Sequence, residues 1–144
     1  SGMRAVTTES RDQRVYGTTY QTNQLFEYAV DKDELKLLGP TFLTGSYTTI
    51  TLLSPDEKYV YYLPGSHGGA FKHGTPIVQF NRQSQRRKVL AFLAPYCERE
   101  LGYVPAGTYG AKLSTDGSTL YVTASDTLCR VRTNPLSHME KERH

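Results

Sequence analysis

The sequence predicts an all-β protein built from repeated antiparallel meanders of four strands each. One observation is that short runs placing an aliphatic or β-branched residue before a tyrosine recur along the chain. A second is that two of these runs follow matching Ser-x-Asp turns, which are typical of a tight change in chain direction. A third is that no long stretch keeps the helical period of 3.6 residues. At 144 residues, the chain is expected to form one domain.

The repeated tyrosine strand is expected to be the second strand of each unit. Its three copies are Arg14-Val15-Tyr16-Gly17-Thr18, Tyr59-Val60-Tyr61-Tyr62-Leu63 and Thr119-Leu120-Tyr121-Val122-Thr123. The turns before the last two copies begin at Ser54 and Ser114, 60 residues apart. In such turns, serine and aspartate side chains bond their own backbone. A β-rich run before each turn supplies a first strand, at residues 48–53 and, less regularly, in a stretch ending at residue 113.

A third strand is predicted after each tyrosine strand, and a fourth strand after two of them. The third strands, at residues 25–30, 77–81 and 128–132, alternate apolar and polar side chains with a period of two. Polar turns lead into fourth strands at residues 35–38 and 88–93. The first unit is therefore expected to have strands two to four, the second unit strands one to four, and the third unit strands one to three. Together they make about ten strands.

The ends of the chain lack this pattern. Ser1-Gly2 before Met3 resembles a cloning scar, and residues 1–12 are expected to be scar and disordered lead. Residues 13–133 are expected to form the repeat domain, and residues 134–144 a disordered tail. No apolar run approaches the roughly 20 residues of a membrane helix, and no signal-peptide core is present. No membrane association is therefore predicted, and the cellular compartment stays open.

Charge and cysteine content predict neither a nucleic-acid partner nor a metal or other cofactor. The formal net charge of +3 is small, and the run Arg86-Arg87-Lys88, with Arg82 nearby, is interpreted as a polar turn rather than a phosphate-binding patch. No Cys/His cluster has zinc-ligand spacing. Cys97 and Cys129 are too few for a disulfide framework, so one bridge and two free thiols both stay open.

The turn and the strand after it resemble the PD40/TolB-type and related repeats of β-propellers, whose blades commonly carry Ser-Pro-Asp-Gly between their first two strands. Residues 54–62 have this pattern with Glu57 in place of glycine, and residues 114–122 have it with Thr115 in place of proline. The resemblance implies a propeller-type architecture over residues 13–133. It implies little about function, because propellers serve as hydrolases, lyases, lectins and scaffolds alike.

About two and a half blades are fewer than the four to eight of known propellers. A blade cannot bury both of its faces without neighbours, so three interpretations stay open. The chain is part of a longer propeller protein, or it closes a ring by self-association, with two copies of ten strands giving five four-stranded blades. In the third interpretation the strands form a compact β-sandwich or barrel.

The loop at residues 64–75 is one candidate ligand-binding site, because it is longer than the matching loops of the other units. It contains His67, Lys72, His73 and four glycines, which suit acid–base chemistry and close approach of backbone to a ligand. The alternative is a long flexible hairpin with exposed histidines. The spacing of His67 and His73 matches no standard metal motif.

The first strands carry the second candidate site, because the resemblance implies that they line a central channel. Tyr109, Lys112 and Tyr47 would then lie near that channel, where tyrosine and lysine suit a sugar or a carboxylate. The alternative is that Tyr109 packs in the core and Lys112 is solvated.

The sequence contains no catalytic motif that would decide between binding and catalysis. It has no Gly-x-Ser-x-Gly elbow and no phosphate loop, and carboxylate pairs such as Glu98 and Glu100 are expected in turn-like surface segments. This favours a non-catalytic binding or interaction module for a carbohydrate or a protein. The alternative is a fragment of a propeller enzyme, a lyase or hydrolase acting on carbohydrate or ester substrates, so whether the chain is an enzyme stays open.

Overall fold

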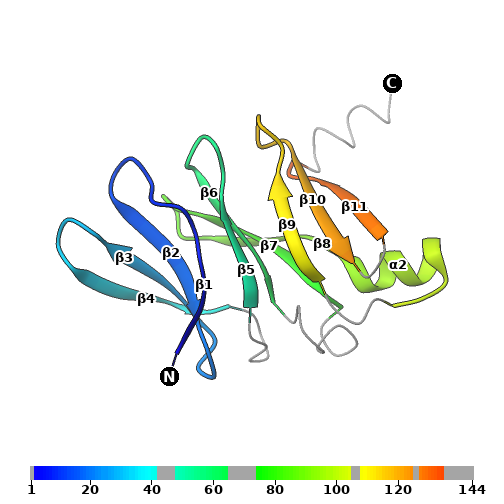
Figure 1. Ribbon diagram of the computed structural model, residues 1–144, viewed down its shortest axis with the longest axis horizontal. Coiled ribbons are helices and arrows are strands. Elements are labelled where there is room, and N and C mark those ends of the chain that lie inside the picture. The colour runs from blue at the N-terminus through cyan, green and yellow to red at the C-terminus, as the bar shows by residue number, and fades with distance from the viewer. Residues whose placement is uncertain (1, 42–47, 65–73, 105–107, 125–126, 135–144) are drawn as a thin grey trace.

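The computed structural model of the chain describes residues 2–41, 48–64, 74–104, 108–124 and 127–134. These residues form eleven strands and one helix (Figure 1). The elements are β1 (Met3–Val6), β2 (Arg14–Thr19), β3 (Gln24–Ala29), β4 (Glu34–Pro40), β5 (Thr48–Leu53), β6 (Tyr59–Pro64), β7 (Pro76–Asn81), β8 (Arg87–Phe92), α2 (Leu93–Leu101), β9 (Thr108–Leu113), β10 (Thr119–Ala124) and β11 (Thr127–Arg132). Within these ranges no helix has the length and apolar character needed to span a membrane.

The strands form three separate antiparallel sheets, each a meander of consecutive strands. We call them blade 1 (β1–β4), blade 2 (β5–β8) and blade 3 (β9–β11). β1 corrects one prediction, because it lies inside the segment expected to be a disordered lead and yet pairs with β2. The described residues thus contain eleven strands rather than about ten, and the first unit has a first strand of its own. The remaining division into lead, domain and tail stays a prediction.

A serine–aspartate corner joins the first and second strands of every blade. In each corner the serine hydroxyl donates a hydrogen bond to the aspartate carboxylate; the pairs are Ser10–Asp12, Ser54–Asp56 and Ser114–Asp116. The residue after each aspartate has a left-handed backbone; these residues are Gln13 (φ 60°), Glu57 (φ 62°) and Gly117 (φ 76°). The two corners identified in the sequence are therefore equivalent bends, and blade 1 contains a third.

A tyrosine stands opposite a polar residue on the second and third strands of every blade. The pairs are Tyr16–Glu27, Tyr61–Gln79 and Tyr121–Arg130. Directly opposed residues on neighbouring strands share a face of the sheet, so the three pairs mark the same face of three equivalent blades.

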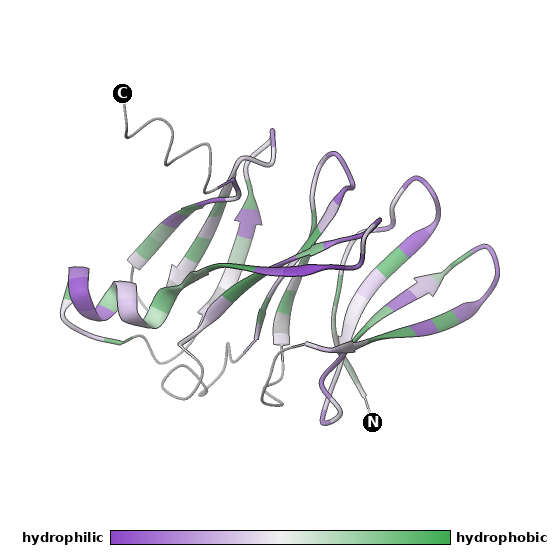
Figure 2. Cartoon of the chain, turned by 180° about the vertical axis from the view of Figure 1, so that it is seen from behind, coloured by the Kyte–Doolittle hydropathy of each residue, from purple (hydrophilic) through white to green (hydrophobic). Residues whose placement is uncertain are grey.

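The hydrophobic core lies between neighbouring blades. The buried residues between blades 1 and 2 are Tyr16, Leu25, Val60, Tyr62, Val78 and Phe80. Those between blade 2, α2 and blade 3 are Ile50, Leu63, Ile77, Leu93, Cys97, Leu120, Val122 and Cys129. Figure 2 shows hydrophobic stretches within the strands and hydrophilic hairpin ends. Because each cluster draws on two blades, each blade depends on a neighbour to bury its face.

Helix α2 was not predicted from the sequence, which placed Glu98 and Glu100 in a turn-like segment. Its first turn contains Pro95, where the missing N–H costs no helical hydrogen bond. Gly102 ends the helix with φ 77° and donates its N–H to the carbonyl oxygen of Glu98 at 3.1 Å. Both glutamates are exposed. Their surface position was therefore predicted correctly, and their local structure was not.

Candidate functional site

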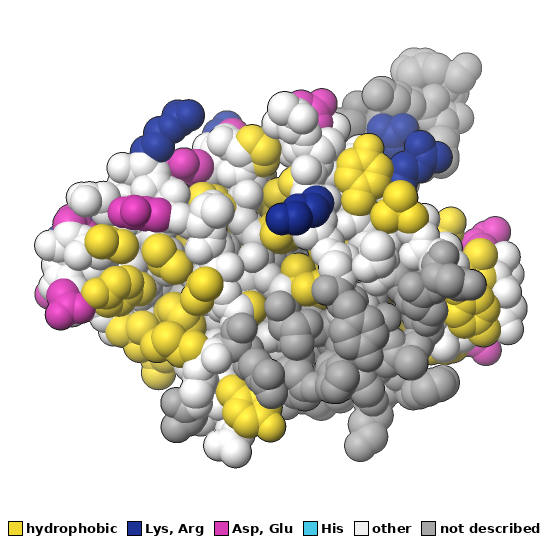
Figure 3. Space-filling view, viewed as in Figure 1, with side chains coloured by type: hydrophobic (Ala, Val, Ile, Leu, Met, Phe, Trp, Pro, Cys, Tyr) yellow, Lys and Arg dark blue, Asp and Glu magenta, His cyan; other side chains and the backbone are white. Residues whose placement is uncertain are grey.

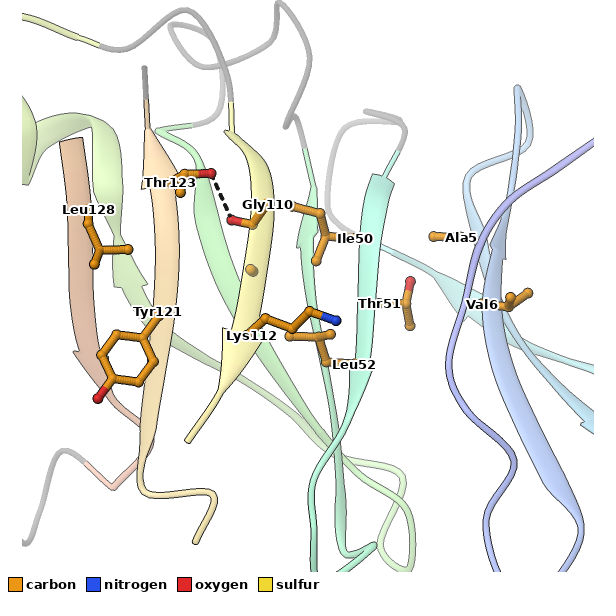
Figure 4. Close-up of a pocket in the computed structure, with 11 residues that line it drawn as sticks. Ala5, Val6, Ile50, Thr51, Leu52, Gly110, Lys112, Tyr121, Thr123 and Leu128 are labelled. Carbon is orange, nitrogen blue, oxygen red and sulfur yellow. Dashed lines mark hydrogen bonds between the residues drawn. The ribbon is translucent and has the colours of Figure 1, made fainter. Parts of the chain in front are cut away.

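The inner strands β1, β5 and β9 lie beside one another, and a groove of about 590 Å³ runs along them (Figure 4). Its walls come from all three blades and are lined by Ala5, Val6, Ile50, Thr51, Leu52, Gly110, Ala111, Lys112, Tyr121, Thr123 and Leu128. Most of these side chains are apolar, and Lys112 is the one charged residue among them. The groove therefore combines a mainly apolar wall with a single cationic group.

Strand β9 positions Lys112 in this groove. Lys112 pairs with Tyr121 on β10, so both side chains project from the same face of blade 3. The lysine side chain is exposed and extends toward Leu52 of blade 2 (Figure 4). None of the ion pairs formed by the described residues includes Lys112. Its ammonium group is therefore available to a carboxylate or another hydrogen-bond acceptor on a ligand.

Only part of the predicted site lies in the described residues. Lys112 lines the groove, and Tyr109 lies in β9, where the structure describes its backbone alone. The other predicted residues, His67, Lys72, His73 and Tyr47, lie outside the described residues, and their role stays a prediction. Sequence reasoning missed the apolar wall formed by Val6, Ile50 and Leu52. Val6 was missed because β1 had not been recognised as a strand, whereas the strand containing Ile50 and Leu52 was predicted but these two residues were not singled out.

A second cluster of charged groups, around Arg82, joins blades 1 and 2. Arg82 donates to both carboxylate oxygens of Asp12 at 2.8 Å, to the hydroxyl of Tyr16 at 3.0 Å and to the carbonyl oxygen of Glu57 at 2.8 Å. The Tyr16 hydroxyl in turn donates to Glu27 at 2.6 Å. These partners occupy the guanidinium fork, so the cluster fastens two blades together rather than offering a free anion site.

Burial and hydrogen bonds shift the pKa values in this cluster. Burial, followed by the hydrogen bond to Glu27, raises the pKa of Tyr16 to about 12. The hydroxyl of Ser10, followed by the guanidinium of Arg82, lowers the pKa of Asp12 below its ordinary value. Tyr16 is thus held neutral and Asp12 ionised at neutral pH, which suits the cation between them.

The basic run at residues 86–88 was predicted to be a polar turn; Arg86 lies between β7 and β8, whereas Arg87 and Lys88 belong to β8. Arg87 points back into the protein, where it donates to the hydroxyl of Tyr62 at 3.0 Å and to the carbonyl oxygen of Leu38 at 2.7 Å. It therefore contacts blade 1, as Arg82 does. Two of the arginines that would form a phosphate patch are already bonded within the protein.

Cys97 of α2 and Cys129 of β11 are free thiols, and both are buried in the core between blades 2 and 3. Burial, and then the neighbouring Cys129, raise the pKa of the Cys97 thiol. Of the two alternatives left open by the sequence, the structure has the free thiols. Across the described ranges, no group of three or more His, Cys, Asp or Glu residues is arranged to hold a metal ion.

The fold is shared with solved structures of much longer proteins. TolB from Acinetobacter baumannii superimposes with a TM-score of 0.59 at 15% identity, over 88% of this chain and 28% of TolB. A putative 6-phosphogluconolactonase from Bacteroides uniformis gives 0.65 at 16% identity, over 92% of this chain and 37% of that protein. The structure of YCF48 bound to D1 peptide superimposes with a TM-score of 0.60 at 11% identity, over 90% of this chain and 36% of YCF48. No protein-family model and no curated protein matches the sequence.

These comparisons and the three separate sheets show that the chain is a partial β-propeller. The propeller-type prediction is confirmed, and the alternative of a compact sandwich or barrel is not what the strands form. The chain spans about a third of the length of these solved structures. At such low identity the likeness defines the fold alone, and propellers of this kind include both binding proteins and enzymes.

Proposed function

We propose that the chain is a non-catalytic binding module that holds an extended segment of another protein along its inner strands. The observation that carries this proposal is the groove itself, in which apolar side chains from β1, β5 and β9 lie beside the exposed cation of Lys112, which forms no ion pair with the described residues. An extended segment presents alternate side chains to such a surface and can direct a carboxylate at the lysine.

A propeller of known structure offers a precedent for a peptide ligand, because YCF48 was solved bound to D1 peptide. A carbohydrate ligand would depend on Tyr47 and on the ring of Tyr109, which the structure does not describe. The enzyme alternative depends in the same way on His67 and His73. The support for a protein ligand comes from the described groove lining, which is mainly apolar with one lysine.

Fluorescence anisotropy with a library of labelled peptides tests the proposal. The peptides alternate leucine with serine and end in either a free carboxylate or an amide. We expect peptides with a free carboxylate to bind more tightly than the amides. Lys112→Ala should weaken binding of the carboxylate peptides by roughly tenfold, whereas Lys112→Arg should retain most of the affinity. Lys36→Ala, on the outer strand β4, is the control and should bind as wild type does.

Two results would overturn the proposal. One is that no peptide binds, or that Lys112→Ala and Lys36→Ala behave alike. The other is hydrolysis of a glycan or ester panel by the wild type that is lost on replacing His67 and His73 with alanine, which would establish the enzyme alternative.

A further inference from the structure

The outer face of blade 3 is exposed at positions that are buried in the other two blades. The comparison uses the residue two positions before the polar partner of each tyrosine, on the third strand of each blade. These residues are Leu25, Ile77 and Leu128, and their exposed fractions are 0%, 0% and 62%. The exposed fractions of the paired tyrosines show the same difference between blades, with 1% for Tyr16, 2% for Tyr61 and 37% for Tyr121. In blades 1 and 2 the next blade covers this face. The repeat therefore identifies what fits the open face of blade 3, namely the apolar face of another blade.

Blade 1 exposes the complementary face. Gly17 pairs with Val6 and Phe26, and Phe26 pairs with Leu37, so these residues share the face that points away from blade 2. Val6, Leu35 and Leu37 on this face are 58%, 47% and 56% exposed. Blades 2 and 3 bury the equivalent faces against the preceding blade.

Both open faces can be seen from the same side of the molecule. In Figure 1, blade 1 extends to the left of the inner strands and blade 3 extends to the right. Figure 3, viewed from the same direction, shows hydrophobic side chains gathered over blade 1 and a second group over β10 and β11. A single partner approaching from this side can cover both faces.

Cationic side chains flank the apolar residues on the open face of blade 3. Lys112, Arg130 and Arg132 project from the open face of blade 3, because their directly opposed neighbours include Tyr121 and Thr119. In blade 1, Asp31 is already paired with Arg14 at 2.7 Å, so the match between the two faces rests on their apolar side chains rather than on opposite charge.

We infer that the partner is a second copy of this chain, related by a half turn about an axis along the inner strands. Blade 3 of each copy packs on blade 1 of the other, and two copies of three blades give a ring of six, within the four to eight blades of known propellers. This differs from the five blades predicted from ten strands per copy. The inference does not require a ligand in the groove, and because Val6, Tyr121 and Leu128 belong to both the groove and the open faces, the second copy would cover part of the groove.

Sedimentation velocity of the 144-residue chain at micromolar concentration is the first test. The expected result is a species of twice the 16.2 kDa chain mass that dissociates on dilution. A chain that stays monomeric at about 100 μM would overturn the inference, and would indicate that further blades of a longer chain cover these faces. Trimers or open-ended polymers would overturn the two-copy ring.

Matched variants test which faces meet. Leu37→Asp on blade 1 and Leu128→Lys on blade 3 each place a charge in both junctions of the pair, and each should weaken dimerisation by more than about tenfold. Leu101→Asp on α2 is the control, because Leu101 is also 40% exposed but lies on neither face. Circular dichroism checks that every variant is folded.

Mixing the two interface variants gives the most specific result. In the mixed pair one junction contains both changes, which are of opposite charge, and the other junction is wild type. Dimers should therefore reappear on mixing Leu37→Asp with Leu128→Lys, although neither variant dimerises alone. If mixing does not restore dimers, or if Leu101→Asp disrupts them equally, these two faces are not the partners.

Discussion

Arg82 Nη2 lies 2.8 Å from both carboxylate oxygens of Asp12, although 70 positions separate the two residues in the chain. Arg82 follows β7 of blade 2, and Asp12 belongs to the serine–aspartate corner of blade 1. The same guanidinium also reaches Tyr16, whose ring lies 5.2 Å from its central carbon. One side chain therefore bonds several groups of a neighbouring sheet with which its own sheet shares no backbone hydrogen-bond ladder.

Replacing Arg82 with alanine should lower the free energy of unfolding by about 2–3 kcal/mol, because Asp12, Tyr16 and the carbonyl group of Glu57 all lose a charged donor. Urea unfolding followed by circular dichroism measures this. Arg86→Ala, in the same turn, is the control and should change stability by less than about 0.5 kcal/mol. Equal effects of the two substitutions would show that Arg82 does not fasten the blades.

Asp116 should make the stability of the protein fall at acid pH. Hydrogen bonds from the backbone and hydroxyl of Ser118, and then from Ser114, lower the pKa of Asp116 to about 2. The unfolded value is about 3.9, so the stabilisation is fully present above pH 4 and is lost as the pH falls toward 2. Asp116→Asn should therefore be less stable than wild type at pH 6, with the difference shrinking toward pH 2.

Urea unfolding of both proteins between pH 6 and pH 2 provides this comparison. The same series in about 0.5 M sodium chloride is the control, since salt screens long-range repulsion and leaves the hydrogen bonds of the corner in place. A difference between the two proteins that stays constant with pH would argue against the linkage.

Gly117→Ala should destabilise the protein by roughly 1–2 kcal/mol or more. Gly117 has φ 76°, and an added Cβ would lie 2.9 Å from Cδ of Pro55 in the neighbouring corner. Gln13 is the matched position in blade 1 and also has a positive φ, so Gln13→Gly should be neutral or up to about 1 kcal/mol more stable. Thermal unfolding of both variants tests the pair, and a Gly117→Ala protein as stable as wild type would contradict the prediction.

The two thiols should react with DTNB far more slowly in the native protein than in denaturant. Cys97 is fully buried and Cys129 is 6% exposed, so modification requires local opening of α2 or β11. We expect native rates on the order of 10² below those in guanidinium chloride. Absorbance of the released thiolate gives both rates, and Cys129→Ser separates the two sites. A native rate close to the denatured rate would show that this core is open.

The repeats could be predicted where turn chemistry is explicit. Ser54 and Ser114 begin turns that contain proline or glycine, and the strands after them were found. The corner at Ser10 has neither residue, and its similarity appears in the structure, in the Ser10–Asp12 hydrogen bond and the left-handed backbone of Gln13. Helix α2 has nine residues and shows no periodicity beyond Leu93 and Cys97, which is too little to outweigh a β-rich context.

The candidate site could be predicted only in part. Lys112 was identified because the fold resemblance placed first strands at the channel. Val6 was missed because β1 is a short strand that is defined by its pairing with β2 rather than by its own pattern. The exposure of Leu128 could not be read from the sequence either, since Leu25 and Ile77 have similar chemistry and are completely buried.

The tyrosine pairs have a consequence for how neighbouring blades recognise one another. Tyr16 is paired with an anionic residue, Tyr61 with a neutral amide and Tyr121 with a cationic residue. Arg82 of blade 2 bonds Tyr16, the tyrosine whose partner is anionic, and Asp12 beside it; neither Gln79 nor Arg130 at the equivalent positions offers a carboxylate. Sheets with closely similar backbones thus present different charges at one equivalent position, and the junction of blades 1 and 2 is chemically distinct from the junction of blades 2 and 3.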